Sequence, residues 1–507
     1  MTTFTTPTRR TDRTTGLHYA ETPVRQRTVL TCGSWRRVTR RIVCGLTCAL
    51  TVSSLLMPSI SFAAERVEVD GNTYNAGTAA GDGSTWAWDG ADDMTLNGYN
   101  GGGIAAYGKL NVSHEGNNTV ANDEGDGISV VDGANEGAEL NISGTGTLTA
   151  TAEGNALYSE GDMTISGTGT VTAKGAGAEG ILADGDITIT GGGTVDARSE
   201  QDCGIVAEET LTVSNSTLTA QGFGSGIYAF DGLTIDAATV RAYAYPARED
   251  SPTAIYTDEG DITIKNGSLV HAYAEGENAA GISSYNFYPG GSGGRIFISD
   301  STVEAIAHYI NRDNGNQPLP PICYSDFVVV EPDATARTFG IIAITENGLT
   351  PATISITRSR VTAEGDTAAI LAVVNSGDGS ISGTIDIVDS IIETPDGGRI
   401  CDVHFVDNET DDILHQRGQT IGTANDVITD LYSDAIAKRA VIVPVDTPPA
   451  KPESKPKVTT AAATIKHVNA KDTLAATGDA SAMGAVAAAI TGMAAVVAGI
   501  FTSRKRS

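Results

Sequence analysis

Short alternations of apolar and polar residues recur at a regular spacing between Leu140 and Ala305. The first of them, Leu140-Asn141-Ile142, has six later copies, and the first four intervals are 22 to 24 residues long. The last two intervals lengthen to 29 and 34 residues. The copies are Met163-Thr164-Ile165, Ile187-Thr188-Ile189, Leu211-Thr212-Val213, Leu233-Thr234-Ile235, Ile262-Thr263-Ile264 and Ile296-Phe297-Ile298. A repeat of nearly constant length in this range is typical of a solenoid.

Each period also contains two further alternations. One reads Val171-Thr172-Ala173 and the other Gly180-Ile181-Leu182-Ala183, and both recur in later periods. Because a period of two places one face of a strand inward and the other outward, each repeat predicts three short strands. The Gly, Asp and Asn residues between them are typical of tight turns, and no interval has room for a crossover helix. No repeat shows the helical period expected of ankyrin or leucine-rich repeats.

These features predict an all-β fold, namely a single-stranded parallel β-helix with about 22–24 residues per coil and about twelve coils. At ~4.8 Å per coil, the stack should be on the order of 60 Å long. We place the β-helix in residues 91–405, an N-terminal cap in residues 64–90 and a C-terminal cap in residues 406–443. Within the C-terminal cap, the apolar spacing predicts a helix over Ala424–Lys438. Its buried face should hold Val427, Ile428, Leu431 and Ala435.

The N-terminal residues 1–63 have the features of an export signal with a long basic leader. A basic stretch that includes Arg36 and Arg41 precedes an uncharged apolar run from Ile42 to Met57. Ser61-Phe62-Ala63 then supplies small residues where a signal peptidase needs them. The apolar run is short for a membrane span, so cleavage is favoured over a membrane anchor. The mature protein is therefore expected outside the cytoplasm.

The C-terminal part has two segments of different character. Residues 444–473 are rich in Pro, Lys, Thr and Ala, which predicts an extended and disordered linker. Residues 474–507 contain a pentapeptide, an apolar helix from Ala480 to Thr502 and the basic tail Arg504-Lys505-Arg506. The pentapeptide is Leu474, Ala475, Ala476, Thr477 and Gly478. The span would halt export in the membrane, while the basic tail would hold the cytoplasmic side.

This order of parts resembles a cell-wall sorting signal of Gram-positive bacteria, of the Leu-Ala-x-Thr-Gly type. The resemblance implies that a sortase transpeptidase cleaves between Thr477 and Gly478 and joins the threonine to peptidoglycan. Ala475 stands where the commonest motif has proline, which leaves the sortase class open. The alternative is a plain C-terminal membrane helix. The protein is thus expected at the cell surface, covalently attached to the wall.

Charge and cysteine content narrow the functions further. The chain totals −29 and residues 1–63 and 479–507 carry +7 and +2, so residues 64–478 carry −38. A body this acidic argues against nucleic acid as a partner and against attraction to anionic membranes. Cys203, Cys323 and Cys401 remain after removal of the leader, an odd number with no metal-binding spacing. We therefore expect no disulfide framework, and we expect a monomer.

The stretch from Asn72 to Thr302 resembles the carbohydrate-binding β-helix domains of Gram-positive surface proteins. The residues that carry the likeness are the glycine-rich turn before Ile104, the strand Leu110-Asn111-Val112 and the run Asn117-Asn118-Thr119-Val120. These are fold motifs, so they indicate the fold more specifically than a ligand. The resemblance implies sugar binding at a cell surface, with calcium in some members.

Carboxylates precede the repeated Ile-Thr-Ile strands and could lie one above another in stacked coils. The candidate metal ligands are Asp162, Asp184, Asp186 and Asp261. Stacked like charges repel one another, and calcium, which takes oxygen ligands in a flexible geometry, would relieve this repulsion. The alternative, which we favour, is that Asp-Gly sequences serve only as tight turns.

The outward side of the second strand in each period gathers cationic and aromatic residues. The candidate carbohydrate-binding residues are Lys174, Arg198, Arg241, Tyr243, His271 and Tyr273. Long insertions at Tyr245–Thr253 and Asn311–Thr338 border this face, as the walls of a groove would. Arginines can hold carboxylates or sulfates, and exposed aromatic rings pack on sugar rings. We therefore predict an adhesive role through binding of an acidic polysaccharide.

Two other functions remain open at this stage. A polysaccharide lyase could use Arg241 as base, with Asp196 and Glu200 holding calcium, although these three residues match such a site only loosely. No catalytic sequence motif stands out, which favours a protein without enzymatic activity. A non-binding surface stalk is the third reading, and the fold alone does not choose among the three.

Overall fold

The computed structural model describes residues 64–133, 137–245, 251–286, 293–309, 337–346, 350–376, 380–407 and 414–445. These residues lie in one compact unit that ends at Asp446. The predicted export signal, most of the linker and the sorting signal, including Leu474 to Gly478, lie outside the described residues. Within the described part all regular structure is β-strand. Accordingly, no helix in that part has the length and apolar character needed to cross a membrane.

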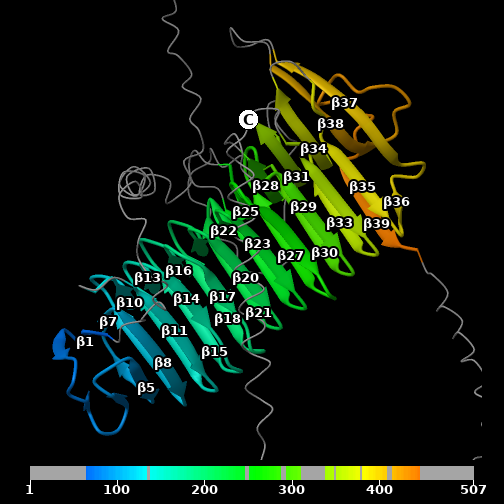
Figure 1. Cartoon of the computed structure of the whole chain (residues 1–507). Helices are drawn as coiled ribbons and strands as arrows, with labels where there is room; N and C mark the ends of the chain where they lie inside the picture. The colour runs from blue at the N-terminus through cyan, green and yellow to red at the C-terminus, as the bar shows by residue number, and fades with distance from the viewer. Residues whose placement is uncertain are drawn as a thin grey trace, which may run out of the picture. The chain divides into compact units, whose positions relative to one another are not determined.

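The strands form three long sheets, which we name A, B and C (Figure 1). Sheet A has the order β3 (Ala80–Gly81), β4 (Trp86–Trp88), β5 (Asp93–Asn97), β8 (Lys109–Glu115), β11 (Glu139–Gly144), β14 (Asp162–Ile165), β17 (Ile187–Ile189), β20 (Thr210–Ser214), β23 (Gly232–Asp236), β26 (Asp261–Lys265), β29 (Arg295–Ser299), β32 (Thr353–Thr357) and β35 (Thr384–Val388). Sheet B has the order β2 (Asn72–Asn75), β1 (Arg66–Val69), β7 (Ile104–Tyr107), β10 (Ile128–Val131), β13 (Leu157–Ser159), β16 (Ile181–Ala183), β19 (Ile205–Ala207), β22 (Ser225–Ala229), β25 (Thr253–Thr257), β28 (Ala280–Asn286), β31 (Phe339–Glu346), β34 (Ala368–Ser376), β38 (Leu414–Gly422) and β37 (Arg399–Asp407). Sheet C has the order β6 (Asn100–Gly101), β9 (Asn117–Asn122), β12 (Thr147–Ala152), β15 (Thr170–Gly175), β18 (Thr194–Ser199), β21 (Thr217–Phe223), β24 (Thr239–Tyr245), β27 (Leu269–Glu275), β30 (Thr302–His308), β33 (Arg360–Gly365), β39 (Arg439–Pro444) and β36 (Ser390–Thr394).

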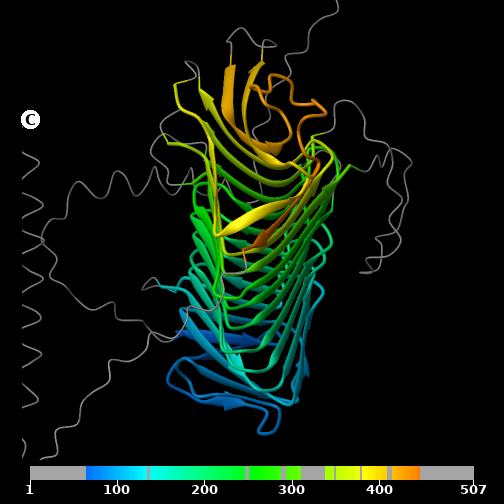
Figure 2. The ribbon, with the colours of Figure 1, turned by 90° about the vertical axis from the view of Figure 1, so that its right-hand side faces the viewer.

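The chain visits the sheets in the fixed order A, C, B and repeats this order coil after coil. Ten coils follow one another between β5 and β34, each with one strand in every sheet, compared with about twelve expected. Figure 2 shows the turned view, in which successive coils lie one above another along the stack. This arrangement of long parallel sheets fits a parallel β-helix solenoid, so the all-β fold class predicted from the alternations is confirmed.

The register of the sheets follows the sequence repeat. In sheet A, Leu140 lies opposite Met163, Met163 opposite Ile187, and Ile187 opposite Leu211. In sheet C the Val-Thr-Ala strands pair in the same way, with Val171 opposite Val195. These inward residues are at most 2% exposed. Burying a Leu, Ile or Val side chain contributes roughly 1.5–3 kcal/mol, and a one-residue slip would expose all of them, which fixes the register.

Antiparallel strands end sheets A and B on the N-terminal side and sheets B and C on the C-terminal side. At the N-terminal end, β1 pairs antiparallel with β2 and β7, and β4 pairs antiparallel with β3 and β5. At the C-terminal end, β38 pairs antiparallel with β34 and β37, and β39 lies antiparallel between β33 and β36. Such strands cover edges of the parallel stack that would otherwise offer unpaired backbone groups.

The helix predicted over Ala424–Lys438 is wrong. The segment consists of turns and two isolated bridges, in which Ile428 pairs with Val403 and Ile436 with Gly422. Ile428 and Ile436 are buried in a cluster against β37, whereas Val427, expected on the inner face, is 53% exposed. Backbone bonds to the neighbouring strands replaced the intrahelical bonds, because the same apolar residues could be buried in an extended form.

Candidate functional site

The outer face of sheet C carries the predicted binding residues in two adjacent columns. One column runs in register through Lys174, Arg198, Gln221, Tyr243 and Tyr273. The other runs through Asp196, Thr219, Arg241 and His271. Successive strands in a sheet lie about 4.8 Å apart, so each column is a straight ladder across the coils. The structure thus places all six candidate residues on one face, as the alternation predicted.

Two of the candidate residues, Arg198 and His271, are already engaged by carboxylates on the same face. Arg198 Nε and Nη2 donate to Asp196 Oδ1 and Oδ2 at 2.8 and 2.7 Å. This bidentate hydrogen bond raises the pKa of Arg198. His271 Nδ1 lies 2.8 Å from Glu304 Oε2, which is on the adjacent strand of sheet C, in the next coil. Half-exposed pairs of this kind are worth about 0–1 kcal/mol, so a ligand carboxylate could replace the protein's own.

Lys174 and Arg241 differ from these residues. Among the described residues, neither has a carboxylate within ion-pair distance, although both lie on the outward face. Lys174 is exposed and Arg241 is partly exposed. They lie three coils apart in the sheet, which corresponds to about 14 Å along the stack. Thr172 and Thr219 lie on the same face and supply hydroxyl groups beside the two cations.

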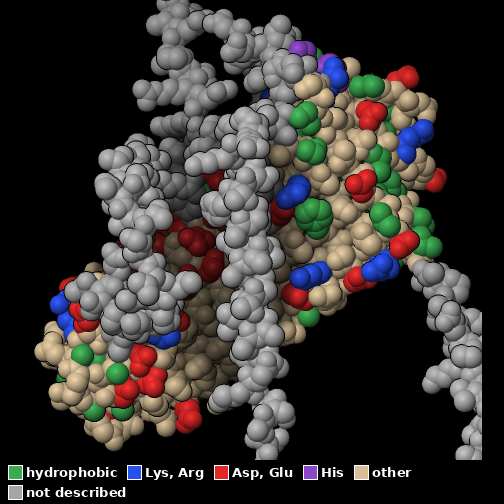
Figure 3. Space-filling model, in the orientation of Figure 1, with side chains coloured by type: hydrophobic (Ala, Val, Ile, Leu, Met, Phe, Trp, Pro, Cys, Tyr) green, Lys and Arg blue, Asp and Glu red, His purple; other side chains and the backbone are tan. Residues whose placement is uncertain are grey.

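Sheet A provides a contrast, because the cations on its outer side are paired. Lys265 lies 3.5 Å from Asp236, and Arg358 Nε lies 2.8 Å from Asp300 at the corner that follows sheet A. Figure 3 shows blue and red side chains next to each other in a largely tan surface. The outward column of this sheet is mostly neutral and consists of Asn111, Asn141, Thr164, Thr188, Thr212, Thr234 and Thr263.

The two tyrosines of the candidate site are buried. Tyr243 and Tyr273 are 4% and 8% exposed and pack with Tyr245, Phe223 and Ile306. Tyr273 also donates a hydrogen bond from its hydroxyl to Glu275 Oε1 at 2.9 Å. We expected exposed rings that a sugar could stack on, and in the described conformation these rings are instead part of a small apolar cluster. The groups that this face exposes to solvent are therefore its charged and hydroxyl side chains.

A chain of ionisable residues continues beyond the tyrosines at the corner between sheets C and B. Glu275 is 1% exposed and lies opposite His308 in the sheet. His308 Nδ1 faces Asp366 Oδ1 at 3.9 Å, and the interaction with Asp366 raises the pKa of His308. Burial opposes the charged form of Asp366, but the imidazole of His308 and a hydrogen bond from the Tyr309 amide hold the pKa of Asp366 below its usual value.

Both long insertions leave the stack at this same corner. One follows β24 and precedes β25, and the other follows β30 and precedes β31. Residues 246–250 and 310–336, the middle parts of the two insertions, lie outside the described residues. The two long insertions therefore both fall on the connection between sheets C and B, while shorter extensions, as between β28 and β29, fall between sheets B and A.

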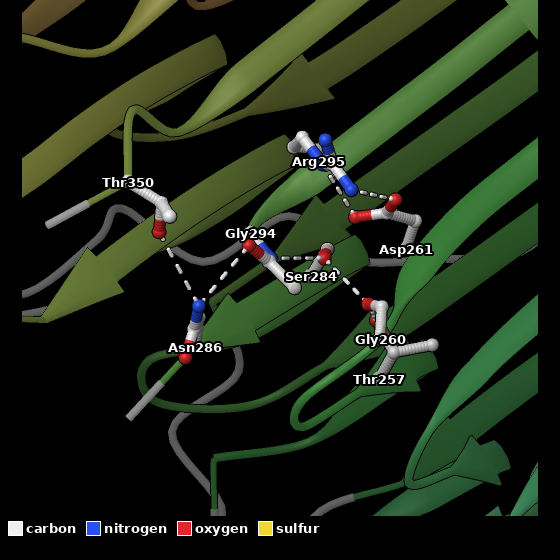
Figure 4. A network of polar contacts seen from close by, with 9 residues as sticks. Thr257, Gly260, Asp261, Ser284, Asn286, Gly294, Arg295 and Thr350 are labelled. Atoms are coloured by element: carbon white, nitrogen blue, oxygen red, sulfur yellow. Dashed lines mark hydrogen bonds and ion pairs between the residues drawn. The ribbon is translucent and has the colours of Figure 1, made fainter. Parts of the chain in front are cut away.

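The carboxylates of Asp162, Asp186 and Asp261, three of the four candidate metal ligands, accept hydrogen bonds from the protein's own donors. Asp162 Oδ1 accepts the Asp186 amide at 3.0 Å, and Asp186 Oδ1 accepts the Thr210 amide at 3.0 Å. Asp261 forms a bidentate pair with Arg295 at 2.9 and 2.6 Å, next to Ser284, which bridges two turns (Figure 4). The backbone amide of Asp184 donates to the Ser159 carbonyl at 2.9 Å. These contacts tie each turn to the next coil, as the turn reading of the Asp residues requires.

The acidic group with the closest carboxylates lies elsewhere. Asp89, Asp92 and Asp93, next to β5, are the one set of three metal-ligating side chains that converge within the described ranges. Asp89 accepts the amides of Ala91 and Asp93, which is the geometry of a local turn. The lyase reading gains no support either, since Asp196 is bound to Arg198 and lies two strands, about 10 Å, from Arg241.

Sequence reasoning missed an aromatic column on the outer face of sheet B. Tyr158, Leu182, Val206, Tyr228 and Tyr256 follow one another in register. The rings of Tyr228 and Tyr256 stack with centroids 5.6 Å apart. Each of these residues directly follows the inward Leu or Ile of a sheet B strand, so the period of two was the signal that could have revealed the column.

The comparisons with known proteins leave the function to be argued from this geometry. Searches with family models, among curated proteins and among solved structures find no match to this chain.

Proposed function

We propose that this chain is a wall-anchored surface protein whose coil stack binds an acidic polysaccharide across the outer face of sheet C. The observation that carries the proposal is the pair of unpaired cations, Lys174 and Arg241, on one face of a body with net charge −38. Arg198 on the same face is already held by Asp196, whereas Lys174 and Arg241 have no carboxylate partner among the described residues. Their charge is available to an anionic ligand.

The remaining groups on this face suit a linear, hydroxylated anion. A guanidinium can grip a carboxylate or sulfate through two parallel hydrogen bonds, which Arg241 offers directly and Arg198 offers after release of Asp196. Thr172, beside Lys174, and Thr219, between the two cations, lie in register with Asp196 and can bond sugar hydroxyls. The sheet holds these groups in a fixed spacing, so little ordering is lost on binding.

A glycan array tests the binding proposal. We expect the purified chain to bind acidic glycans, with binding that weakens at high salt because the contacts are charged. A Lys174→Ala, Arg241→Ala double variant should lose at least tenfold in affinity. The matched control is Lys265→Ala, which removes a cation that is already paired with Asp236 on sheet A.

Each contrary result has a distinct meaning. Equal binding by wild type and the double variant would move the site away from this face. No binding to any glycan would favour a non-binding stalk. The chain can also be incubated with pectin, alginate or hyaluronan in the presence of calcium. Release of unsaturated sugars, measured by their ultraviolet absorbance, would identify a lyase instead.

The anchoring proposal rests on the sequence of the C-terminal segment. A protein with Leu474-Ala475-Ala476-Thr477-Gly478 before an apolar span and a basic tail should be released from cells by a wall hydrolase and not by detergent. Thr477→Ala should leave the protein in membrane or medium, because the transpeptidase would lose the residue that it joins to peptidoglycan. Unchanged wall linkage in this variant would rule out sorting through the motif.

A further inference from the structure

Two histidines converge on the solvent side of the C-terminal hairpin. His404 lies on β37 and His415 on β38, and His404 Nε2 is 3.1 Å from His415 Nδ1. Their rings are 5.3 Å apart between centroids and inclined by 33°. The neighbouring residues Val403 and Phe405 point to the other side, into the buried cluster under the hairpin. The two imidazoles therefore face outward, with one nitrogen of each directed at the other.

The backbone holds this pair in place from both edges of β37. On one edge, β37 pairs antiparallel with β38, where His404 lies opposite Arg417 and Val406 opposite His415. On the other edge, the His404 amide donates to the Ile428 carbonyl at 2.9 Å. Because both edges are bonded, the two rings are presented together without any rearrangement of the chain.

The separation of the nitrogens matches that of two ligands on one metal ion. Each neutral imidazole has one ring nitrogen without a proton. With the ring protons on His404 Nδ1 and His415 Nε2, both facing nitrogens present lone pairs to the space between them. Nitrogen ligands about 2.0–2.1 Å from zinc, at right or tetrahedral angles, stand about 2.8–3.4 Å apart. The observed 3.1 Å lies in this range.

We infer that His404 and His415 form a two-histidine site for a divalent transition-metal ion such as zinc, copper or nickel. Imidazole nitrogens suit these ions, whereas calcium and magnesium require oxygen ligands. Within the described ranges no third His, Cys, Asp or Glu converges with the pair, so the other coordination positions go to water or to a group brought by a ligand. The ion joins β37 to β38 and so stabilises the hairpin that ends sheet B.

Thermal unfolding of the purified chain without a histidine tag tests the site, with zinc, nickel or copper chloride as the probe. We expect each ion to raise the Tm and to bind with one-to-one stoichiometry in calorimetry, while magnesium at equal concentration gives no such rise. The copper complex should show the electron-spin splitting of two imidazole nitrogens. His404→Gln and His415→Gln should each weaken binding at least tenfold.

The metal-induced shift is compared within each variant, so a change in the stability of the metal-free protein does not affect the result. The matched control is His271→Gln, which removes a half-exposed histidine paired with Glu304 on sheet C and should keep the full metal response. No metal-induced shift in the wild type would show that the pair is an N–H···N hydrogen bond only. An equal shift in His404→Gln and wild type would place the ion elsewhere, and either result overturns the inference.

Discussion

At the scale of single residues, the corner between sheets A and C depends on a left-handed backbone conformation. Asn215, Asn266 and Asp300 adopt φ values of 48°, 59° and 49° there, and Ala237 adopts 50° at the equivalent place. Asn and Asp tolerate this conformation because their short polar side chains bond locally. For alanine it costs roughly 1–2 kcal/mol. Ala237 is therefore a strained residue at an exposed corner.

Ala237→Asn should raise the free energy of unfolding by about 1 kcal/mol, because asparagine accepts the left-handed conformation more readily. Denaturant unfolding measures the change. The control is Asn215→Ala in the preceding coil, which should lower stability by a similar amount. No change in either variant would mean that this corner relaxes its φ angle freely.

The buried His114 and the partly buried His308 should have opposite effects on how stability depends on pH. His114 is 1% exposed, both its ring nitrogens lack hydrogen-bond partners among the described residues, and burial lowers its pKa. Its contribution is present above the unfolded pKa of about 6.5 and is lost as pH falls towards the folded pKa. For His308, whose pKa is raised by Asp366, the contribution is complete below about 6.5 and is lost as pH rises through the folded pKa.

Unfolding curves between pH 5 and 8 separate the two effects. The free energy of unfolding of His114→Leu should fall less than that of wild type on acidification below about pH 6.5. The variant has no buried imidazole whose protonation favours the unfolded state. The stability difference between wild type and His308→Gln should be largest below that pH and shrink towards pH 8. Parallel curves for all three proteins would contradict both assignments.

At the scale of the elements, glycine at the start of the sheet B strands lets the coils approach each other. A Cβ at Gly204 would lie 2.6 Å from the Gln221 amide nitrogen of β21, and one at Gly180 would lie 2.6 Å from that of Arg198. Both contacts are closer than real Cβ atoms make. Ala156 and Ala254 stand at the equivalent place in two other coils, where the backbone leaves room for a methyl group.

Gly204→Ala should therefore destabilise the chain by about 1–3 kcal/mol, the range for overpacking, because backbone atoms of the next coil must move. Thermal unfolding of the purified variant measures the loss. Gly125→Ala is the control, since its Cβ would meet only the Asn122 side chain, at 3.4 Å. An equal loss in both variants would point to chain entropy and not to crowding between coils.

The sequence predicted the strands well because an inward position such as Leu140 or Ile187 has to be apolar in every coil. It failed at Ala424–Lys438, since a helix and a turn-rich segment bridged to strands can bury the same residues. The burial of Tyr243 could not be predicted from the sequence either, because it depends on contact with Phe223 in another coil. The pairing of Arg198 with Asp196 could have been predicted, since residues two apart in a strand share a face.

At the scale of the whole molecule, the net charge of −38 in residues 64–478 opposes the compact state through self-repulsion. The candidate calcium ligands Asp162, Asp186 and Asp261 are occupied by amides and by Arg295. Cations are therefore expected to act on the general field of the body more than at a ladder of sites.

Raising sodium chloride from about 10 to about 150 mM should raise the Tm, because the screening length falls from about 30 to about 8 Å. Calcium chloride at matched ionic strength should raise the Tm by no more than sodium chloride, and a chelator should leave the melting curve unchanged. A rise specific to calcium would show bound ions and restore the carboxylate ladder as a metal site.

The antiparallel strands at both ends of the stack have a consequence for how such a chain can change over generations. The coils between them pair only with coils of the same form, so one coil can follow another at any point. Duplication of a 24-residue repeat would add one more coil, about 4.8 Å of height, while both ends stay as they are. The length of the stack can thus increase in steps of one coil from one ancestral protein to the next.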